Sequence, residues 1–201
     1  MIYAAPATFL LLVLNVLVAV YTLVVDPSVL ERWAFRPARV AREREWGRWI
    51  TAGFVHVGLA HLAFNMITLF FFGPFIERQL GSWRFLVLYF GAELAANALT
   101  YWRHRDNPQY SAAGASGAIA GIVFAFVLFR PWEPIYLFFI PVGIPAVIFA
   151  GLYVALSIYA SQQGGGRVAH EAHLGGALGG VALTVLLYPA ALGIFLRQLG
   201  L

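Results

Sequence analysis

Two short motifs, far apart in the chain, contain residue types that could form a nucleophile and its base. Ser116 lies between glycines in Gly114-Ala115-Ser116-Gly117, at the start of an apolar stretch without charge until Arg130. His173 lies at the start of the last apolar stretch. A histidine that accepts the proton of a serine hydroxyl makes that hydroxyl a nucleophile. A serine at such a position can also hydrogen-bond to its own helix, so Ser116 alone is weak evidence.

Glycines around both residues favour close helix packing. Small residues four positions apart let two helix backbones approach each other in a membrane. Such steps follow the serine and the histidine at Gly117/Gly121, Gly175/Gly179 and Gly176/Gly180. We therefore expect the two helices to pack together and to bring hydroxyl and imidazole within about 2.6–3.2 Å.

His61 and Asn65 form a second polar pair. Their four-residue spacing places them on one face of a helix. Both side chains can donate a hydrogen bond to an oxyanion that develops during acyl transfer. They could instead bond to each other, or to loop carbonyls, and merely hold the helix in place.

The chain that positions these residues is predicted to be an all-α polytopic membrane helix bundle. It is 61% hydrophobic and 11% charged, whereas soluble domains have about a quarter charged residues. Pro141 and Pro145 suggest that one apolar stretch, residues 134–160, is bent and mobile. We treat residues 1–201 as one domain. Because a span needs about 20 apolar residues, we expect six transmembrane helices, at 6–25, 59–76, 84–102, 114–129, 134–160 and 169–196.

Composition excludes several other classes. The chain has no cysteine, so it has no disulfide, no thiolate nucleophile and no cysteine-bound metal. The net charge of +4 does not indicate a nucleic-acid partner, because the basic residues are dispersed over loops between apolar spans. No basic segment precedes the first apolar run, which favours a retained helix over a cleaved signal. We expect no cofactor and no metal; the oligomeric state stays open.

The long connection 26–58 differs from the other loops. Tryptophan and arginine side chains suit the headgroup layer, because each has an apolar body and a polar tip. The connection is an ordinary interfacial loop or a partly embedded structure that braces the bundle or thins the bilayer. The residues concerned are Arg32, Arg36, Arg39, Arg42, Arg44, Arg48, Trp33, Trp46 and Trp49. A second connection, 161–167, is glycine-rich and predicted to be flexible.

Topology places the polar residues together. The loops before the second, fourth and sixth spans share one side, because two crossings separate each from the next. His56 and His61 lie at the start of the second span, Ser116 at the start of the fourth and His173 at the start of the sixth. All four residues are therefore expected at one membrane face and at similar depth.

Four motifs in this order carry a family resemblance. They are His56-x4-His61-x3-Asn65, Glu77-Arg78 followed by Leu80-Gly81-Ser82, Gly114-Ala115-Ser116-Gly117, and Ala172-His173-x2-Gly176-x3-Gly180. In order and spacing, over residues 46–187, the chain resembles the rhomboid family of intramembrane serine proteases.

The resemblance implies a role for each matching residue. Ser116 would be the nucleophile and His173 its general base, without an acidic third member. His61, Asn65 and the Ser116 backbone N–H would form the oxyanion hole. The remaining matches would be supporting: a structural His56, a charged turn at Glu77 and Arg78 that ties loops together, and the motif glycines Gly114, Gly117, Gly176 and Gly180.

The implied reaction is hydrolysis of a transmembrane segment of another protein. Such a segment must unwind first, because a helix shields its carbonyl groups. The fifth span is our candidate for a side gate. In one departure from the family pattern, Ala120 occupies a position where some members have an aromatic residue beneath the histidine. In addition, His170 and Glu171 stand beside the base; Glu171 could orient either histidine, although direct contact with His173 is disfavoured by their spacing.

Three other functions are weighed against this one. A catalytically inactive rhomboid-like protein would bind membrane clients, but would be expected to lack the serine or the histidine. A metalloprotease would need His-Glu-x-x-His, whereas the histidines of His170-Glu171-Ala172-His173 are three apart. A transporter would be expected to have internal repeats or polar residues near the bilayer centre. Only Glu93 and Asn97, four residues apart, suggest this, and we expect them to form hydrogen bonds within the bundle instead.

Two signals disagree about orientation. Loops on the side of Ser116 and His173 contain nine arginines, and loops on the other side contain four. The positive-inside rule would therefore place the side of Ser116 and His173 in the cytoplasm. The resemblance to six-span bacterial rhomboids places it outside, with both termini in the cytoplasm. We follow the resemblance and expect a multi-pass protein of a bacterial or archaeal cell membrane.

Overall fold

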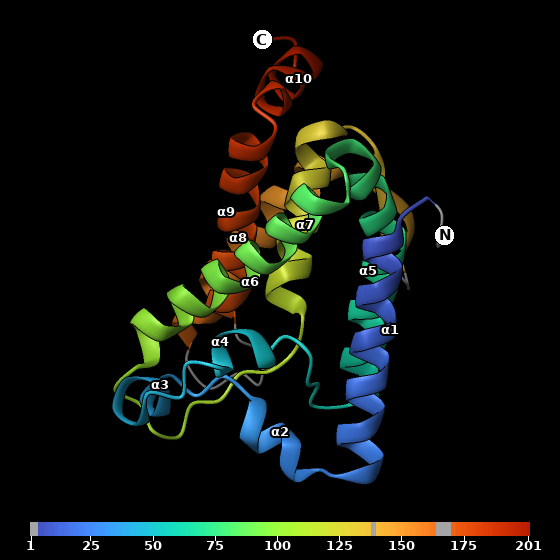
Figure 1. Cartoon of the computed structure of the whole chain (residues 1–201). Helices are drawn as coiled ribbons and strands as arrows, with labels where there is room; N and C mark the ends of the chain where they lie inside the picture. The colour runs from blue at the N-terminus through green and yellow to red at the C-terminus, as the bar shows by residue number, and fades with distance from the viewer. Residues whose placement is uncertain (1–3, 138–139, 164–169) are drawn as a thin grey trace.

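The computed structural model describes residues 4–137, 140–163 and 170–201 (Figure 1). The prediction of a mainly helical chain is confirmed in this part. The helices are α1 (Pro6–Val20) with a π-helical continuation (Tyr21–Val25), α2 (Ser28–Trp33), α3 (Pro37–Glu43), α4 (Arg48–Thr51), α5 (Leu59–Leu80), α6 (Ser82–His104), α7 (Ser116–Phe129), α8 (Ala146–Gln163), α9 (His170–Leu187) and α10 (Ala190–Gln198), and the strands are β1 (Pro134–Leu137) and β2 (Ile140–Pro145).

Fewer helices than expected have the length and hydropathy of a complete span. Among the described residues, Pro6–Val25 and Leu59–Leu80 do, and α9 with α10 would make a third despite a bend of 111° between them. Ser116–Phe129 and Ala146–Ala160 are shorter apolar helices. The structure therefore supports two or three clear spans by this measure.

The expected fifth helix is wrong over its first part. Residues 134–137 and 140–145 form β1 and β2, which pair antiparallel with Ile135 opposite Ile144. Prolines cannot donate the hydrogen bonds of a helix interior, and the β-branched residues between them favour extended backbone. Pro141 and Pro145 consequently lie in β2 and do not bend a helix, and α8 begins only at Ala146.

The expected sixth helix is also interrupted. α9 ends at Leu187, and α10 leaves at 111° after Pro189. A proline in a helix removes a hydrogen bond and clashes with the preceding turn, which explains a break at this point. Residues 164–167 of the predicted flexible loop, and residue 169, lie outside the described residues, whereas 161–163 belong to α8.

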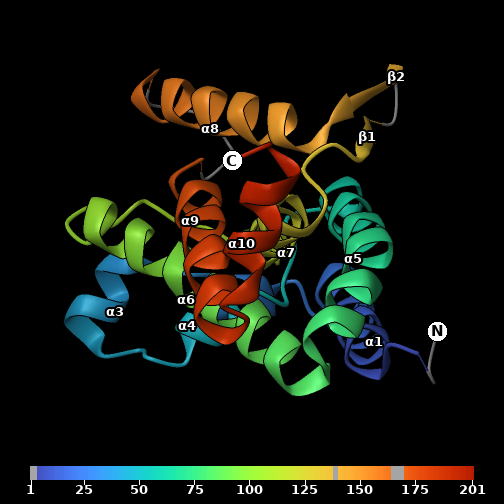
Figure 2. The same ribbon diagram turned by 90° about the horizontal axis from the view of Figure 1, so that it is seen from above.

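α7 is the central helix of the fold. All its residues except Ser116 and Phe126 are buried, as expected for a helix that is apolar on every face. α5, α6 and α9 pack around it, and α1 packs on α5. α8 lies on the outer side of α7 and α9 and is connected to α7 through β1 and β2 (Figure 2). The start of α7 is therefore enclosed by several elements.

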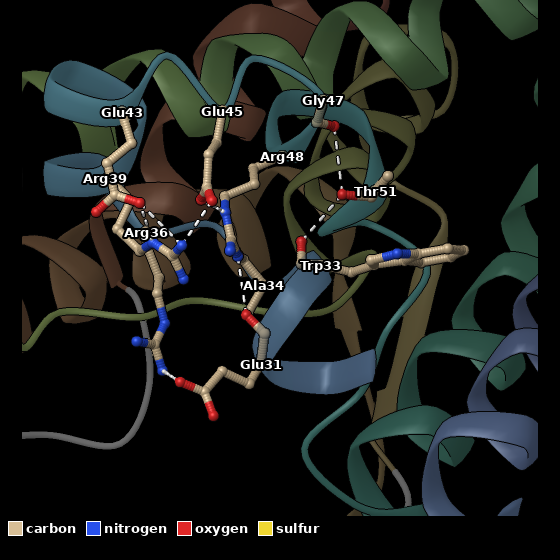
Figure 3. A network of polar contacts seen from close by, with 10 residues as sticks. All are labelled: Glu31, Trp33, Ala34, Arg36, Arg39, Glu43, Glu45, Gly47, Arg48 and Thr51. Atoms are coloured by element: carbon tan, nitrogen blue, oxygen red, sulfur yellow. Dashed lines mark hydrogen bonds and ion pairs between the residues drawn. The ribbon is translucent and has the colours of Figure 1, made fainter. Parts of the chain in front are cut away.

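The connection 26–58 is a folded unit, which supports the bracing interpretation. Arg48 is buried, and its guanidinium donates to the carbonyl oxygens of Glu31 and Ala34 at 2.9 and 2.6 Å and pairs with Glu45 (Figure 3). Arg39 bridges Glu45 as well, at 2.6 Å. These contacts fix α2, α3 and α4 relative to one another.

This folded unit, which we call the arginine brace (residues 26–58), reaches the segment before α7. Phe35 exchanges two backbone hydrogen bonds with Ala112, at 2.7 and 3.0 Å. The Ala52 carbonyl accepts the Gly114 N–H at 2.9 Å. Trp49 packs against Phe35 and against Tyr101 of α6. The brace thereby positions the chain just before Ser116.

Candidate active site

Ser116 and His173 are in hydrogen-bond contact. Ser116 is the first residue of α7, and its Oγ lies 2.9 Å from His173 Nε2 in the first turn of α9. Both side chains line a cavity of about 600 Å³. The hydroxyl can donate its proton to the imidazole in this geometry, which is the arrangement of an activated serine nucleophile.

The expected glycine contacts bring the two helices together. A methyl group on Gly176 would lie 2.1 Å from the Gly117 carbonyl oxygen, and one on Gly180 would lie 2.3 Å from the Gly121 Cα. The other glycine step of α9 faces α6, where a methyl on Gly179 would lie 2.4 Å from the Ala95 Cβ. Glycine is thus required on both sides of α9 for this close approach.

Gly114 shapes the approach to the serine. Its φ of 119° is in the region that L-residues rarely adopt. A Cβ at this position would lie 2.4 Å from Cε1 of His61, so the imidazole packs directly on the Gly114 backbone. The motif glycine therefore allows both the turn before α7 and the contact with His61.

His61 and Asn65 of α5 line the same cavity as Ser116 and His173. Asn65 is buried, and its Nδ2 has no hydrogen-bond partner among the described residues. A buried donor without a partner is unusual in a native protein. An amide at the cavity wall with a free N–H can bind an oxygen of a substrate.

His56 lies behind the cavity rather than on its wall. The side chain is fully buried, and its ring packs edge-on against His61 at 5.3 Å between centroids. Burial, together with the nearby His61, lowers the pKa of His56 to about 4. A neutral imidazole in van der Waals contact with His61 can support that ring without entering the chemistry.

Glu77 and Arg78 lie at the end of α5 remote from the serine. The Glu77 carboxylate accepts hydrogen bonds from the backbone N–H groups of Ala7 and Thr8 at 2.9 and 2.7 Å, and from the Ser82 hydroxyl at 2.6 Å. It ties the starts of α1 and α6 to the end of α5. Arg78 is exposed.

Glu93 contacts the start of α7, a contact that no sequence motif predicts. Its Oε2 accepts the Ala118 N–H at 3.1 Å, and its Oε1 accepts from Asn97 Nδ2 at 3.3 Å. Asn97 Nδ2 also donates to the Trp49 carbonyl oxygen at 3.0 Å. Hydrogen bonds of this pair within the bundle were expected, but the contact with Ala118 depends on how α6 is rotated against α7.

Glu171 contacts α6 and the segment before α7. Its Oε1 contacts His104 Nε2 of α6 and accepts the Tyr110 hydroxyl at 3.2 Å. The His104 and Tyr110 rings are stacked, 3.7 Å apart. The idea that Glu171 orients His170 or His173 is therefore not supported by contacts, and the carboxylate instead joins the start of α9 to α6.

An aromatic ring packs on His173 although position 120 of α7, where an aromatic residue could have stood, is an alanine. Tyr153 of α8 lies 6.1 Å from the His173 ring centroid, with 28° between the ring planes. Tyr153 and Ala120 both line the cavity. No motif identified Tyr153 beforehand, because α8 contributes no motif residue and its rotation about its own axis is set by packing.

These features define a helical membrane protein with a serine–histidine pair in a cavity between its helices. The family model of the rhomboid domain matches residues 43–190, more than half of the chain. The chain belongs to the rhomboid family, which includes intramembrane serine proteases.

Curated relatives agree with this assignment. The chain is 32% identical over 144 residues to the RHOMBOID-like protein 12, mitochondrial, of Arabidopsis thaliana, covering 64% of this chain and 42% of the relative. It is 30% identical over 155 residues to the rhomboid protease GluP of Bacillus subtilis, covering 77% and 29%. With the rhomboid protease GlpG of Haemophilus influenzae, identity is 28% over 148 residues, covering 72% and 71%. The chain thus spans less than half of the first two relatives.

Proposed function

We propose that this protein is an intramembrane serine endopeptidase that cleaves transmembrane segments of other proteins by a serine–histidine dyad. The observation that carries the proposal is the 2.9 Å contact between Ser116 Oγ and His173 Nε2 in a cavity within the helix bundle. Membership of a family with named proteases supports the same reaction.

The reaction would begin with proton transfer from Ser116 to His173 as Oγ attacks a peptide carbonyl. Asn65 and His61, with the Ser116 N–H, would then stabilise the oxyanion. His173 would return the proton to the leaving amine, and water would hydrolyse the acyl-enzyme with His173 again as base. The free Nδ2 of Asn65 favours this role over one in which the amide only pins α5.

Six spans remain part of the proposal. α6 is long enough to cross a bilayer, α7 and α8 are apolar although short, and α9 continues into α10. In this topology the starts of α5, α7 and α9 share a side, in agreement with the cavity that His61, Ser116 and His173 line. We propose that this side faces outward, against the arginine distribution; a reporter fused to Leu201 would test it.

The source membrane also stays a prediction. We propose a bacterial or archaeal cell membrane; the relatives include proteins of the bacterium Bacillus subtilis and a protein named as mitochondrial. The lipid bilayer and transmembrane protein substrates are the proposed partners.

The decisive experiment measures cleavage of a transmembrane substrate by purified protein in detergent. Ser116→Ala and His173→Ala, made separately, should each abolish cleavage. Labelling of Ser116 by a fluorophosphonate should be present in the wild type and absent in Ser116→Ala. Cleavage that survives both substitutions would disprove the assignment, and loss of activity with a chelator but not with the serine reagent would favour a metalloprotease.

An inactive rhomboid-like protein that binds membrane clients is the alternative. Nothing in the dyad geometry favours it, because both groups are present and in contact. Wild-type protein that binds a transmembrane peptide, yet neither cleaves it nor reacts with the fluorophosphonate, would establish that alternative.

A further inference from the structure

The imidazole of His173 needs a support that keeps it directed at Ser116. Its Nε2 contacts the Ser116 hydroxyl, and Glu171, the nearest carboxylate in the sequence, is engaged by His104 and Tyr110 instead. The His170 ring also contacts the imidazole edge-on, at 6.2 Å between centroids. A general base whose ring is not held in one plane can rotate away from its nucleophile. A misplacement of about 1 Å can lower a rate about 100-fold.

The position beneath the imidazole on α7 supplies no such support. Ala120 is one helical turn after Ser116, and its methyl group lines the cavity. Phe149 and Tyr153 of α8 line the same cavity. Phe124, a further turn along α7, instead packs edge-on against Tyr153 at 5.6 Å between ring centroids.

Tyr153 supplies an aromatic ring from α8. Its ring lies against His173 at 6.1 Å and 28°, an offset-stacked geometry within the range of favourable aromatic pairs. Phe124 and Phe149 hold the ring at 5.6 and 5.9 Å. Three aromatic side chains thus fix the plane on which the imidazole rests.

We propose that Tyr153 is a positioning residue that aligns His173 with Ser116, and that α8 thereby supplies the aromatic support which α7 lacks at Ala120. Base alignment then depends on α8 lying against α7 and α9. A displacement of α8 withdraws the ring from the imidazole and weakens the dyad. This inference rests on the proposed function.

The test uses a fluorophosphonate, because this small reagent reports the reactivity of Ser116 without a transmembrane substrate. The labelling rate of Tyr153→Ala should fall about tenfold to 100-fold, and its pH–rate profile should shift because the surroundings of the imidazole change. Tyr153→Phe retains the ring and should restore the wild-type rate. Tyr159→Ala is the matched control, since Tyr159 is an exposed aromatic on the same helix.

A relocated ring provides the second comparison. Ala120→Tyr combined with Tyr153→Ala returns an aromatic to the same space from α7 and should recover most of the labelling rate. This double variant also decides the matter if Tyr153→Ala alone does not fold. The proposal is overturned if the folded double variant is labelled no faster than Tyr153→Ala. If Tyr153→Ala is unfolded, the same conclusion follows when the double variant is labelled no faster than background.

The outcomes separate this inference from the proposed function. A wild-type protein that is neither labelled nor active disproves both. A labelled wild type whose rate and pH profile are unchanged in Tyr153→Ala disproves only the positioning role, as does an equal loss of labelling in Tyr159→Ala.

Discussion

Gly176 packs on Gly117 so closely that a methyl group at position 176 would lie 2.1 Å from the Gly117 carbonyl oxygen. This contact is one residue from Ser116 and three from His173 in the sequence. The spacing between α7 and α9, and therefore the 2.9 Å contact of the dyad, depends on the absence of a side chain at this point.

Gly176→Ala should accordingly separate the dyad. Overpacking typically destabilises a protein by about 1–3 kcal/mol, and a small shift of α9 should lower cleavage about 100-fold. Gly151→Ala is the control, because a methyl there meets nothing within 4 Å and alanine is the better helix former. Thermal unfolding and cleavage should both distinguish the variants. A fully active Gly176→Ala would show that α7 and α9 can move apart without loss of activity.

Asn65→Ala tests the oxyanion assignment. Loss of one oxyanion-hole donor typically lowers kcat about 100-fold to 1,000-fold, and KM should change little because the bond forms mainly in the transition state. Gln79→Ala removes an exposed amide from the same helix and should be neutral. A raised KM with unchanged kcat in Asn65→Ala would instead assign the amide to ground-state binding.

Much of the site could be predicted because its position depends on membrane topology and on glycine spacing, which can both be seen in the sequence. Membrane topology put the starts of three helices on one side, and glycine steps identified the helix faces that now meet at Gly117 and Gly176. The contacts that could not be predicted depend on helix rotation. Glu93 reaches Ala118, and Tyr153 reaches His173, only because α6 and α8 are turned in particular directions by packing.

The strand pair of β1 and β2 could not be predicted for a different reason. An apolar stretch long enough to span a membrane predicts a helix by hydropathy, and the prolines within it predict a bend in that helix. In the structure, Pro134 and Pro145 face each other across β1 and β2. Proline tolerates extended backbone as readily as a first helical turn, so hydropathy alone could not separate the two outcomes.

Arg48→Ala should unfold the arginine brace. Arg48 is 4% exposed and bonds to the carbonyl oxygens of Glu31 and Ala34, and a buried acceptor that loses its donor typically costs about 1–3 kcal/mol. Because the brace holds Ala112 and Gly114, cleavage should fall together with thermal stability. Arg42→Ala removes an exposed arginine of α3 and should change neither; equal behaviour of the two variants would contradict a bracing role.

Glu93→Ala should disturb the start of α7. The carboxylate accepts the Ala118 N–H, and a buried donor that loses its acceptor typically costs about 1–3 kcal/mol. Glu93→Gln keeps an acceptor oxygen and should retain most of the stability and activity. Fluorophosphonate labelling with thermal unfolding would test this, and a Gln variant as damaged as the Ala variant would indicate that the negative charge is what matters.

His56 should make stability fall in acid. Its pKa is about 4 in the folded protein, lowered by burial and by His61, against 6.5 for the unfolded chain. Between these values the unfolded state binds more protons, so the free energy of unfolding decreases as pH falls from 6.5 to 4, by about 1.4 kcal/mol per pH unit from this group. Other groups titrate in the same window, and the comparison with His56→Gln, which cannot be protonated there, isolates the contribution. Unfolding titrations at pH 7.5 and 5 should show a steeper loss for the wild type than for His56→Gln; parallel losses would mean that the imidazole is already protonated, or freely accessible to protons, in the folded protein.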